Sequence, residues 1–376
     1  MEREKVVVLG AGRVGRAIAW DLAQDFRVTA VDRDPGSLSW LAARGVGTVA
    51  GDVTDPEFLA EVGRDSSWVV NAVPGYLGFA VLSALVEQGK EVVDISFMPE
   101  DPRGLDPAAR KRGVRVAVDC GVAPGFSHLV LGFWYARADQ LRRFSCYVGG
   151  LPRERVLPWE YKAPFSPSDV LEEYTRPARL RRDGQVLTLP AMAEPELCHV
   201  PGVGTLEAFL TDGLRTALDT VPIPLMEEKT LRYPGYRDKV LLLRESGLLS
   251  PEPVEVAGVR VAPLAVTAAA LAEAWRFGES EADLTVMKLE AEGVFAGVEE
   301  KRTLLLYDVF DPATGLSSMA RTTGFTATAV LRALRQGLVR EPGVLPPEVL
   351  GQNEAVTRFV VASLRQRGVS VAWGEV

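Results

Sequence analysis

The chain has 376 residues and a formal net charge of −8, from 42 Lys plus Arg against 50 Asp plus Glu. At about 150 residues per domain, this length predicts two domains. A hydrophobic content of 47% is enough to build their cores. The acidic balance argues against a large phosphate-binding surface, so we do not expect nucleic acid as a partner.

Cysteine and histidine are scarce. Cys120, Cys146 and Cys198 form no CxxC pair, and the only histidines are His128 and His199. A disulfide scaffold and a zinc ribbon are therefore not expected, nor is any other metal site. No run approaches the roughly 18 apolar residues of a membrane-spanning helix, and no signal peptide is recognisable. These features predict a soluble cytoplasmic protein without a membrane partner.

The first predicted elements are a buried strand, a glycine turn and a helix. The strand covers Lys5–Leu9 and the helix about Val14–Gln24. Glycines at this spacing allow a tight turn, approach of a pyrophosphate to the helix N-terminus, and close packing of helix on strand. The pattern is typical of a dinucleotide site because it follows the first strand. The cofactor residues assigned to this turn are Gly10, Gly12, Arg13, Val14 and Gly15.

The second predicted strand, Arg27–Val31, ends at Asp32, 22 residues beyond Gly10. A carboxylate at this position accepts hydrogen bonds from the adenosine ribose and repels a 2′-phosphate, so NAD is favoured. The adjacent Arg33 is able to accommodate a phosphate, and NADP is not excluded. Asp32 as a simple strand-end residue is the alternative.

Strands and helices continue to alternate. The following helices are predicted at Leu38–Arg44, Pro56–Val62 and Tyr76–Gln88, and the strands at Gly47–Ala50, Ser67–Asn71, Glu91–Ile95 and Val114–Val118. Ligands of open parallel sheets bind outside the carboxyl ends of the strands. This rule adds further cofactor residues, Asp52, Val53, Asn71, Ala72, Val73 and Pro74. It also places Asp94 along the cofactor and Asp119 near its reactive end. Each Asp or Asn also has an ordinary reading as a cap or turn former.

Dispersed blocks carry a resemblance that covers essentially the whole chain, in order. They are residues 119–126, 149–152, 160–167, 172–178, 206–215, 230–235, 319–325 and 343–348. With them the chain closely resembles the saccharopine dehydrogenase-like family, and within it the lysine 6-dehydrogenases. Several separate blocks are far more specific than one glycine motif.

The resemblance implies an α/β protein in which a Rossmann dinucleotide-binding domain is interrupted by an α+β domain. The Rossmann part is residues 1–124 and 325–376, and residues 125–324 form a substrate-binding and dimerisation domain, so a homodimer is expected. The residues agree. After Phe144 the alternation stops, and long runs at Leu284–Val294 and Lys301–Phe310 predict antiparallel or mixed sheet. From Thr322 the pattern is helical again.

The reaction implied by the resemblance is NAD-dependent oxidation of L-lysine at the ε-carbon, giving 2-aminoadipate 6-semialdehyde, ammonia and NADH. The partner is then a small amino acid. Such a site must take a proton from the ε-ammonium, activate water and hold the α-carboxylate and α-ammonium. The residues expected to be catalytic are Asp94, Asp119, Tyr161 and Lys162. A carboxylate in a closed pocket can have its pKa raised and act as a base.

Substrate binding is assigned mainly to arginines, because guanidinium binds carboxylate bidentately. Arginine is abundant in this chain, so surface ion pairs are the alternative reading for each one. Asp212 is placed to receive an ammonium, and His128 is the runner-up base because it begins a helix. The full set is Cys120, Gly121, Gly125, His128, Thr211, Asp212, Arg215, Arg232 and Arg321.

Two departures bear on the substrate. Saccharopine-acting members carry a basic residue after their Phe-Ser-Trp-Ser block, whereas Asp169 follows here, which points away from saccharopine. Lysine dehydrogenases often have His where this chain has Tyr236. The alternatives kept open are a saccharopine or related secondary-amine dehydrogenase and a non-catalytic NAD-binding protein.

Overall fold

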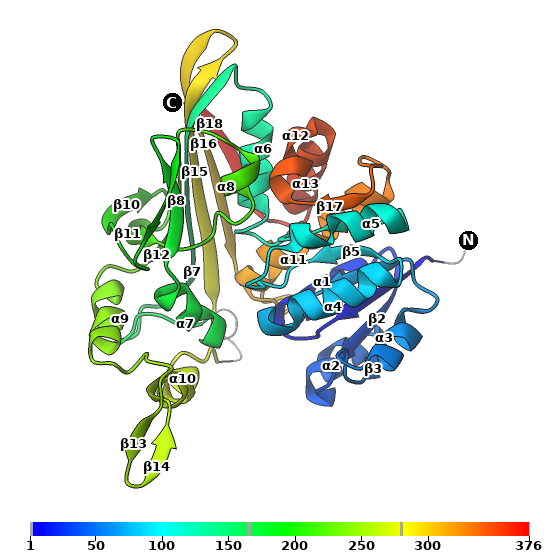
Figure 1. The fold of residues 1–376 in the computed structure, drawn as a ribbon, viewed down its shortest axis with the longest axis horizontal. Helices are drawn as coiled ribbons and strands as arrows, with labels where there is room; N and C mark the ends of the chain where they lie inside the picture. Colours follow the sequence, from blue (N-terminus) through cyan, green and yellow to red (C-terminus); the bar gives the residue numbers. More distant parts are fainter. Residues whose placement is uncertain (1–2, 164–166, 279–280, 376) are drawn as a thin grey trace. The chain divides into compact units, whose positions relative to one another are not determined.

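The computed structural model describes residues 3–163, 167–278 and 281–375. The chain folds into two compact units, each built from several segments (Figure 1). The first unit contains Met1–Ala138, Asp219–Val221 and Ala320–Val369, and the second contains Asp139–Leu218, Pro222–Met319 and Ser370–Val376. Residues 164–166 of the matched block 160–167 lie outside the described residues.

The first unit contains a seven-stranded parallel sheet with the order β17-β6-β5-β4-β1-β2-β3. Its strands are β1 (Lys5–Leu9), β2 (Arg27–Asp32), β3 (Gly47–Ala50), β4 (Trp68–Asn71), β5 (Glu91–Asp94), β6 (Arg115–Ala117) and β17 (Gly343–Leu345). The central strands are buried without alternation, as expected when helices cover both faces of a sheet. The predicted Rossmann sheet is confirmed.

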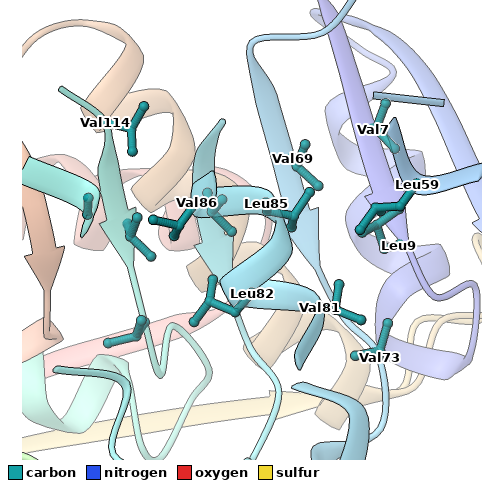
Figure 2. Close-up of a cluster of buried hydrophobic side chains, with 14 of the residues drawn as sticks. Val7, Leu9, Leu59, Val69, Val73, Val81, Leu82, Leu85, Val86 and Val114 are labelled. Atoms are coloured by element: carbon teal, nitrogen blue, oxygen red, sulfur yellow. The ribbon is translucent and has the colours of Figure 1, made fainter. Parts of the chain in front are cut away.

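The helices between these strands begin where the sequence supplies caps. Asp34 and Asp55 each accept hydrogen bonds from backbone amides at the start of a helix, with proline at the following position. The helices are α1 (Arg13–Leu22), α2 (Pro35–Ala42), α3 (Pro56–Gly63), α4 (Gly75–Glu87), η1 (Pro102–Leu105), α5 (Asp106–Arg112) and α6 (Phe126–Tyr135). Figure 2 shows the buried core of this unit, where Leu82 and Leu85 of α4 lie among valines of the sheet.

The C-terminal helices α11 (Ser318–Arg335), α12 (Pro347–Gln352) and α13 (Glu354–Gln366) are tied to the N-terminal part of the chain. Arg332 and Arg367 both donate to the buried carboxylate of Asp21 on α1, each at 2.6 Å. A Cβ added at Gly132 of α6 would lie 2.0 Å from the Glu348 carbonyl oxygen, so α6 and α12 meet backbone to backbone. This packing fixes the helix that carries His128.

The second unit is built on a nine-stranded mixed sheet. Its main order is β10-β11-β12-β7-β15-β16-β18, with β8 beside β12 and β9 beside β8; β12 and β7 run parallel, and the other pairs antiparallel. The strands are β7 (Gln140–Pro152), β8 (Ala178–Arg182), β9 (Gln185–Leu189), β10 (Glu196–Val200), β11 (Gly204–Leu210), β12 (Leu225–Arg232), β15 (Asp283–Phe295), β16 (Val298–Val309) and β18 (Ser370–Glu375). The α/β fold class with a second, mixed sheet is confirmed.

The remaining elements are α7 (Pro167–Thr175), α8 (Ala217–Thr220), α9 (Tyr236–Glu245), α10 (Pro263–Ala274) and the hairpin β13 (Val254–Val256) and β14 (Val259–Val261). The compact units differ from the sequence division at four places. Residues 125–138 belong to the first unit because α6 packs on α12, and residues 219–221 and 320–324 also belong to it. Residues 370–376 belong to the second unit because β18 pairs with β16. The roles assigned to the two domains stay a prediction.

Candidate dinucleotide and amino-acid sites

The three glycines after β1 serve different ends. Gly10 has a φ of 92°, and a Cβ there would lie 2.4 Å from the Ala72 carbonyl oxygen. A Cβ at Gly15 would lie 2.0 Å from the Gly10 carbonyl oxygen. A Cβ at Gly12 would meet nothing within 4 Å. The fold therefore requires Gly10 and Gly15, whereas Gly12 leaves the backbone open to a ligand.

The first turn of α1 offers the donors that such a ligand needs. Its N-cap is Gly12, which makes no side-chain cap, and the first turn carries no acidic residue. The leading amides of a helix have no partner within the helix, and the helix dipole favours an anion there. The predicted residues Arg13 and Val14 stand in this turn. The turn therefore fits a pyrophosphate group.

Asp32 lies at the end of β2 and is held by two loops. Its Oδ2 accepts a hydrogen bond from the Ala11 amide at 2.7 Å, and its Oδ1 accepts one from the Asp34 amide at 2.9 Å. These bonds fix the carboxylate beside the glycine turn, as required for a ribose contact. Arg33 is exposed. The Thr54 hydroxyl and amide, with a smaller contribution from Arg33, hold the pKa of Asp52 below its ordinary value.

The remaining predicted cofactor residues fall into two groups. Ala72 donates its amide to the Leu9 carbonyl at 2.8 Å and so seats the β4–α4 loop against the glycine turn, and Pro74 is the N-cap of α4. Val53, by contrast, packs against the hydrophobic core. The sheet edge thus assembles most of the predicted set, while Val53 has a packing role as well.

Asn71 and Asp94, at the ends of the adjacent strands β4 and β5, are joined directly. Asn71 Nδ2 donates to Asp94 Oδ2 at 2.5 Å, and the Ser96 amide and hydroxyl both donate to Asp94 Oδ1 at 2.8 Å. Burial raises the pKa of Asp94 to about 7, against the lowering effect of those bonds and with a further contribution from Asp119. This carboxyl group therefore titrates near neutrality, although it is fully enclosed.

Asp119 and Cys120 follow β6 close to Asp94. Asp119 has a φ of 51°, and the Cys120 amide donates to the Asp94 carbonyl at 2.9 Å. Burial first, then the charges of Asp119 and Asp94, raise the pKa of the Cys120 thiol well above its ordinary value. Cys120 is therefore a neutral thiol and not an activated nucleophile. Asp94 and Asp119, both predicted to be catalytic, are brought together.

The turn from Gly121 to Gly125 leads into α6. Gly125 has a φ of 134°, and a Cβ there would lie 1.9 Å from the Gly121 carbonyl oxygen, so only glycine fits. His128 is buried, and its Nδ1 is 2.9 Å from the Ser127 hydroxyl oxygen. The structure places this histidine on the helix that follows the Asp119–Gly125 segment, as the sequence predicted.

In the second unit, Arg232 of β12 is the centre of a buried aromatic group. Its guanidinium carbon lies 4.8 to 5.9 Å from three tyrosine ring centroids. Its Nε donates to the Tyr174 hydroxyl at 3.0 Å, and its Nη2 lies 3.4 Å from Glu173 Oε2. Within the described part of the chain, the hydroxyls of Tyr161 and Tyr236 make no hydrogen bond of ideal geometry, but each interacts with the Tyr174 hydroxyl. The three tyrosines and the guanidinium thus form one buried polar group.

The other predicted residues of this unit have protein partners. Lys162 donates to Glu281 Oε2 at 2.6 Å and to the Arg276 carbonyl at 2.8 Å. Asp212 accepts a bidentate pair from the Arg179 side chain, at 2.9 and 3.0 Å. The Asp212 carboxylate is therefore already neutralised. Burial raises the pKa of the Tyr161 hydroxyl well above its usual range, so that group is a proton donor rather than a base.

Arg215 and Arg321 complete the predicted arginines. Arg215 is buried and has a φ of 47°. Arg321 belongs to the first unit, where it donates to the Arg367 carbonyl at 2.8 Å. Thr211 does join a polar group, since its hydroxyl donates to Glu228 Oε2 at 2.7 Å. Sequence reasoning missed Glu228, because its neighbours Glu227 and Lys229 make this part of β12 look like a solvated strand.

The described residues provide neither a cluster of metal ligands nor a membrane-spanning helix. No three His, Cys, Asp or Glu side chains there come together in a way that could hold a metal ion. None of the helices in the same part of the chain is both long and apolar enough to span a membrane.

A doubly wound parallel sheet with an intact glycine turn and an acid at the end of β2 defines an NAD(P)-binding oxidoreductase. Residues 6–117 match the model of the saccharopine dehydrogenase NADP binding domain, and residues 121–369 match that of the saccharopine dehydrogenase C-terminal domain. The chain belongs to the saccharopine dehydrogenase family.

Individual relatives agree. The chain is 25% identical to the NADP⁺-dependent, L-glutamate-forming saccharopine dehydrogenase of Saccharomyces cerevisiae, over 92% of this chain and 94% of that protein. It is 23% identical to the alpha-aminoadipic semialdehyde synthase of Arabidopsis thaliana, over 54% of this chain and 21% of that protein. A solved structure of the apo S. cerevisiae saccharopine dehydrogenase superposes with a TM-score of 0.82 at 22% identity, covering 99% and 100% of the two chains, which shows a shared fold.

Proposed function

We propose that this oxidoreductase is an NAD-dependent dehydrogenase that oxidises L-lysine at the ε-carbon, forming 2-aminoadipate 6-semialdehyde, ammonia and NADH. The ε C–H bond breaks as a hydride leaves, the amine becomes an imine, and water then releases ammonia. NAD⁺, when bound, accepts the hydride. The observation that carries the proposal is the intact glycine turn, bonded through the Ala11 amide to Asp32 at the end of β2, in a chain that matches an amine-oxidising family along its length.

The chain's own residues divide the work as follows. Gly12 and the α1 amides bind the pyrophosphate, and Asp32 binds the ribose and disfavours a 2′-phosphate. Asp119 takes the proton released by the substrate amine, and the enclosed Asp94 positions it. Arg232 binds the substrate carboxylate, with the hydroxyls of Tyr161 and Tyr236 as further donors. Lys162 is held by its ion pair with Glu281, and we assign it a positioning role in the reaction.

Saccharopine oxidation at the secondary amine is the second candidate, and the names of the curated relatives favour it. Asp169 favours lysine, because a substrate with three carboxylates calls for basic residues where this chain has an acid. Steady-state NADH formation, measured separately with L-lysine, saccharopine and L-ornithine, distinguishes the two. We expect the highest kcat/KM with lysine. Activity with saccharopine alone would contradict the proposal.

The proposal includes a homodimer in the cytoplasm, acting on a free amino acid. Sedimentation equilibrium tests the assembly: a mass twice that of the 40.8 kDa chain is expected, and a monomer at all concentrations would contradict it. A second test concerns the cofactor. Calorimetry should show tighter binding of NADH than of NADPH, and the reverse order would show that Arg33 outweighs Asp32.

A further inference from the structure

Glu228 is a buried acid in the middle of β12. It is 5% exposed, and its carboxylate accepts hydrogen bonds from the Thr211 hydroxyl and the Gly213 amide. The Thr211 hydroxyl oxygen is also 2.8 Å from that of Thr230. A Cβ at Gly213 would lie 2.7 Å from the Glu228 carboxyl group, so the chain leaves room for this carboxylate. Glu228 is thus an enclosed, hydrogen-bonded part of the second unit and not a surface residue.

Among the described residues, the charged groups with the largest influence on Glu228 are themselves acids. Glu173 of α7 and Asp212 after β11 are both acids, and Asp212 is paired with Arg179 of β8. On β7, the register partner of Glu228 is Cys146. Burial, opposed by the Thr211 bond and assisted by the two neighbouring acids, raises the pKa of Glu228 to about 8. A buried carboxylate without a cation is costly unless it is protonated or a cationic ligand arrives.

A second observation points to a ligand. Glu228, Thr230 and Arg232 occupy alternate positions of β12 and therefore share one face of the strand. All three are buried. At the Arg232 end of this face, the hydroxyls of Tyr161 and Tyr236 share the Tyr174 hydroxyl, and both side chains are more than nine-tenths buried. Phenol hydroxyls beside a guanidinium suit a carboxylate, and an acid bonded to the neutral donors Thr211 and Gly213 suits an ammonium.

We propose that Glu228 recognises the α-ammonium group of the substrate while Arg232 holds its α-carboxylate, so that the site selects compounds with a free α-amino-acid end. This inference rests on the proposed function, and it specifies which part of the substrate the second unit binds. It applies to lysine and to any substrate that keeps the same end. Glu173 Oε2 lies 3.4 Å from Arg232 Nη2 and helps to keep the guanidinium in place.

A comparison of two ligands measures the contribution of the α-ammonium group to binding. L-Lysine carries it, whereas 6-aminohexanoate has the same carboxylate and ε-amine without it. Titration calorimetry of the NADH-loaded protein should show lysine binding at least about 100-fold more tightly, a difference of about 2.8 kcal/mol. In Glu228→Gln the ratio should fall to about fivefold or less, because lysine binds more weakly while 6-aminohexanoate is unaffected.

The matched control is Glu227→Gln. Glu227 is the adjacent residue of β12, points to the other face, and is bonded to Ser145 at 2.9 Å and Arg143 at 3.1 Å. This variant should keep the wild-type ratio. If Glu228→Gln leaves the ratio unchanged, or weakens both ligands equally, the assignment of Glu228 is wrong although the proposed function stands. A wild-type protein that binds neither ligand contradicts the proposed function and this assignment together.

A measurement on the wild-type protein alone guards against a variant that fails to fold. A cation beside Glu228 lowers its pKa, so lysine binding near pH 7 should release close to one proton. The number of protons follows from binding enthalpies in two buffers with different ionisation enthalpies. 6-Aminohexanoate should release none. Equal release with both ligands, or none with lysine, would overturn the assignment.

Discussion

The glycine turn of the first unit and the buried face of β12 in the second differ in what they offer a ligand. The turn offers backbone amides and an absence of side chains, as at Gly12, where a Cβ would meet nothing. The β12 face offers charged side chains inside an apolar group, as at Arg232 and Glu228. A substitution in the turn therefore acts by blocking approach, whereas one on β12 acts by changing charge.

The largest expected effect comes from the turn. Gly12→Ala should weaken NADH binding at least about 100-fold, or about 2.8 kcal/mol, while the melting temperature of the cofactor-free protein stays within about 2 °C of wild type. Gly15→Ala is the contrasting variant. Its Cβ would lie 2.0 Å from a backbone oxygen, so it should cost about 1–3 kcal/mol of folding stability even without cofactor. Equal melting behaviour of the two variants would contradict the distinction between them.

The next effect belongs to β12. Arg232→Lys keeps the charge but loses the bidentate geometry, so the dissociation constant for the amino acid should rise about 30- to 100-fold. Binding of NADH should be unaffected. Arg237→Lys on α9, whose Nε donates to the Met192 carbonyl, is the control and should bind both ligands as wild type does. An unchanged amino-acid affinity in Arg232→Lys would remove the carboxylate anchor from this strand.

Asp32→Ala should have a smaller effect, because it removes ribose hydrogen bonds of about 1 kcal/mol each. The dissociation constant for NADH should rise about 5- to 30-fold, and that for NADPH should fall because a repulsive charge is gone. Asp34→Ala, which removes only the cap of α2, should destabilise the protein slightly without changing the preference between the cofactors. Calorimetry with both cofactors separates the two outcomes.

The last prediction concerns unfolding rather than binding, namely how the free energy of unfolding changes with pH. The pKa of Glu228 is raised to about 8, so the folded protein holds a proton there that the unfolded chain loses above about pH 4.5. Stability from this group is complete at low pH and is lost as pH rises towards 8, by at most about 1.4 kcal/mol per pH unit. Urea unfolding of the cofactor-free protein between pH 5 and 8 should show a shallower fall for Glu228→Gln. Parallel curves would place Glu228 in contact with water.

The difference between the glycine turn and the β12 face also explains which features could be predicted from the sequence. The parallel sheet, the turn at Gly10 and the acid at Asp32 are all encoded by neighbours in the chain, through local periodicity and turn chemistry. The short elements α5 and β17 were not predicted, because they have too few residues to show a helical or strand periodicity in hydrophobic residues. The pairing of β18 with β16 joins distant segments, which local patterns do not specify.

On β12 the sequence predicted a role for Arg232 but not for Glu228, although it did so for Thr211, which follows β11 and bonds to Glu228. A run with Glu227, Glu228 and Lys229 suggests a solvated strand, and only the packed unit shows that all three are buried. The partners of Lys162 and Asp212 were also out of reach, because Glu281 and Arg179 come from distant positions. Which polar residues face a ligand and which are already paired is decided by tertiary packing.

The position of the oxidised carbon tests the central claim most directly. With L-lysine deuterated at the ε-carbon, mass spectrometry of the reduced cofactor should find one deuterium per NADH, and with lysine deuterated only at the α-carbon it should find none. Deuterium transferred from the α-carbon, or no reduced cofactor from lysine at all, would contradict the account.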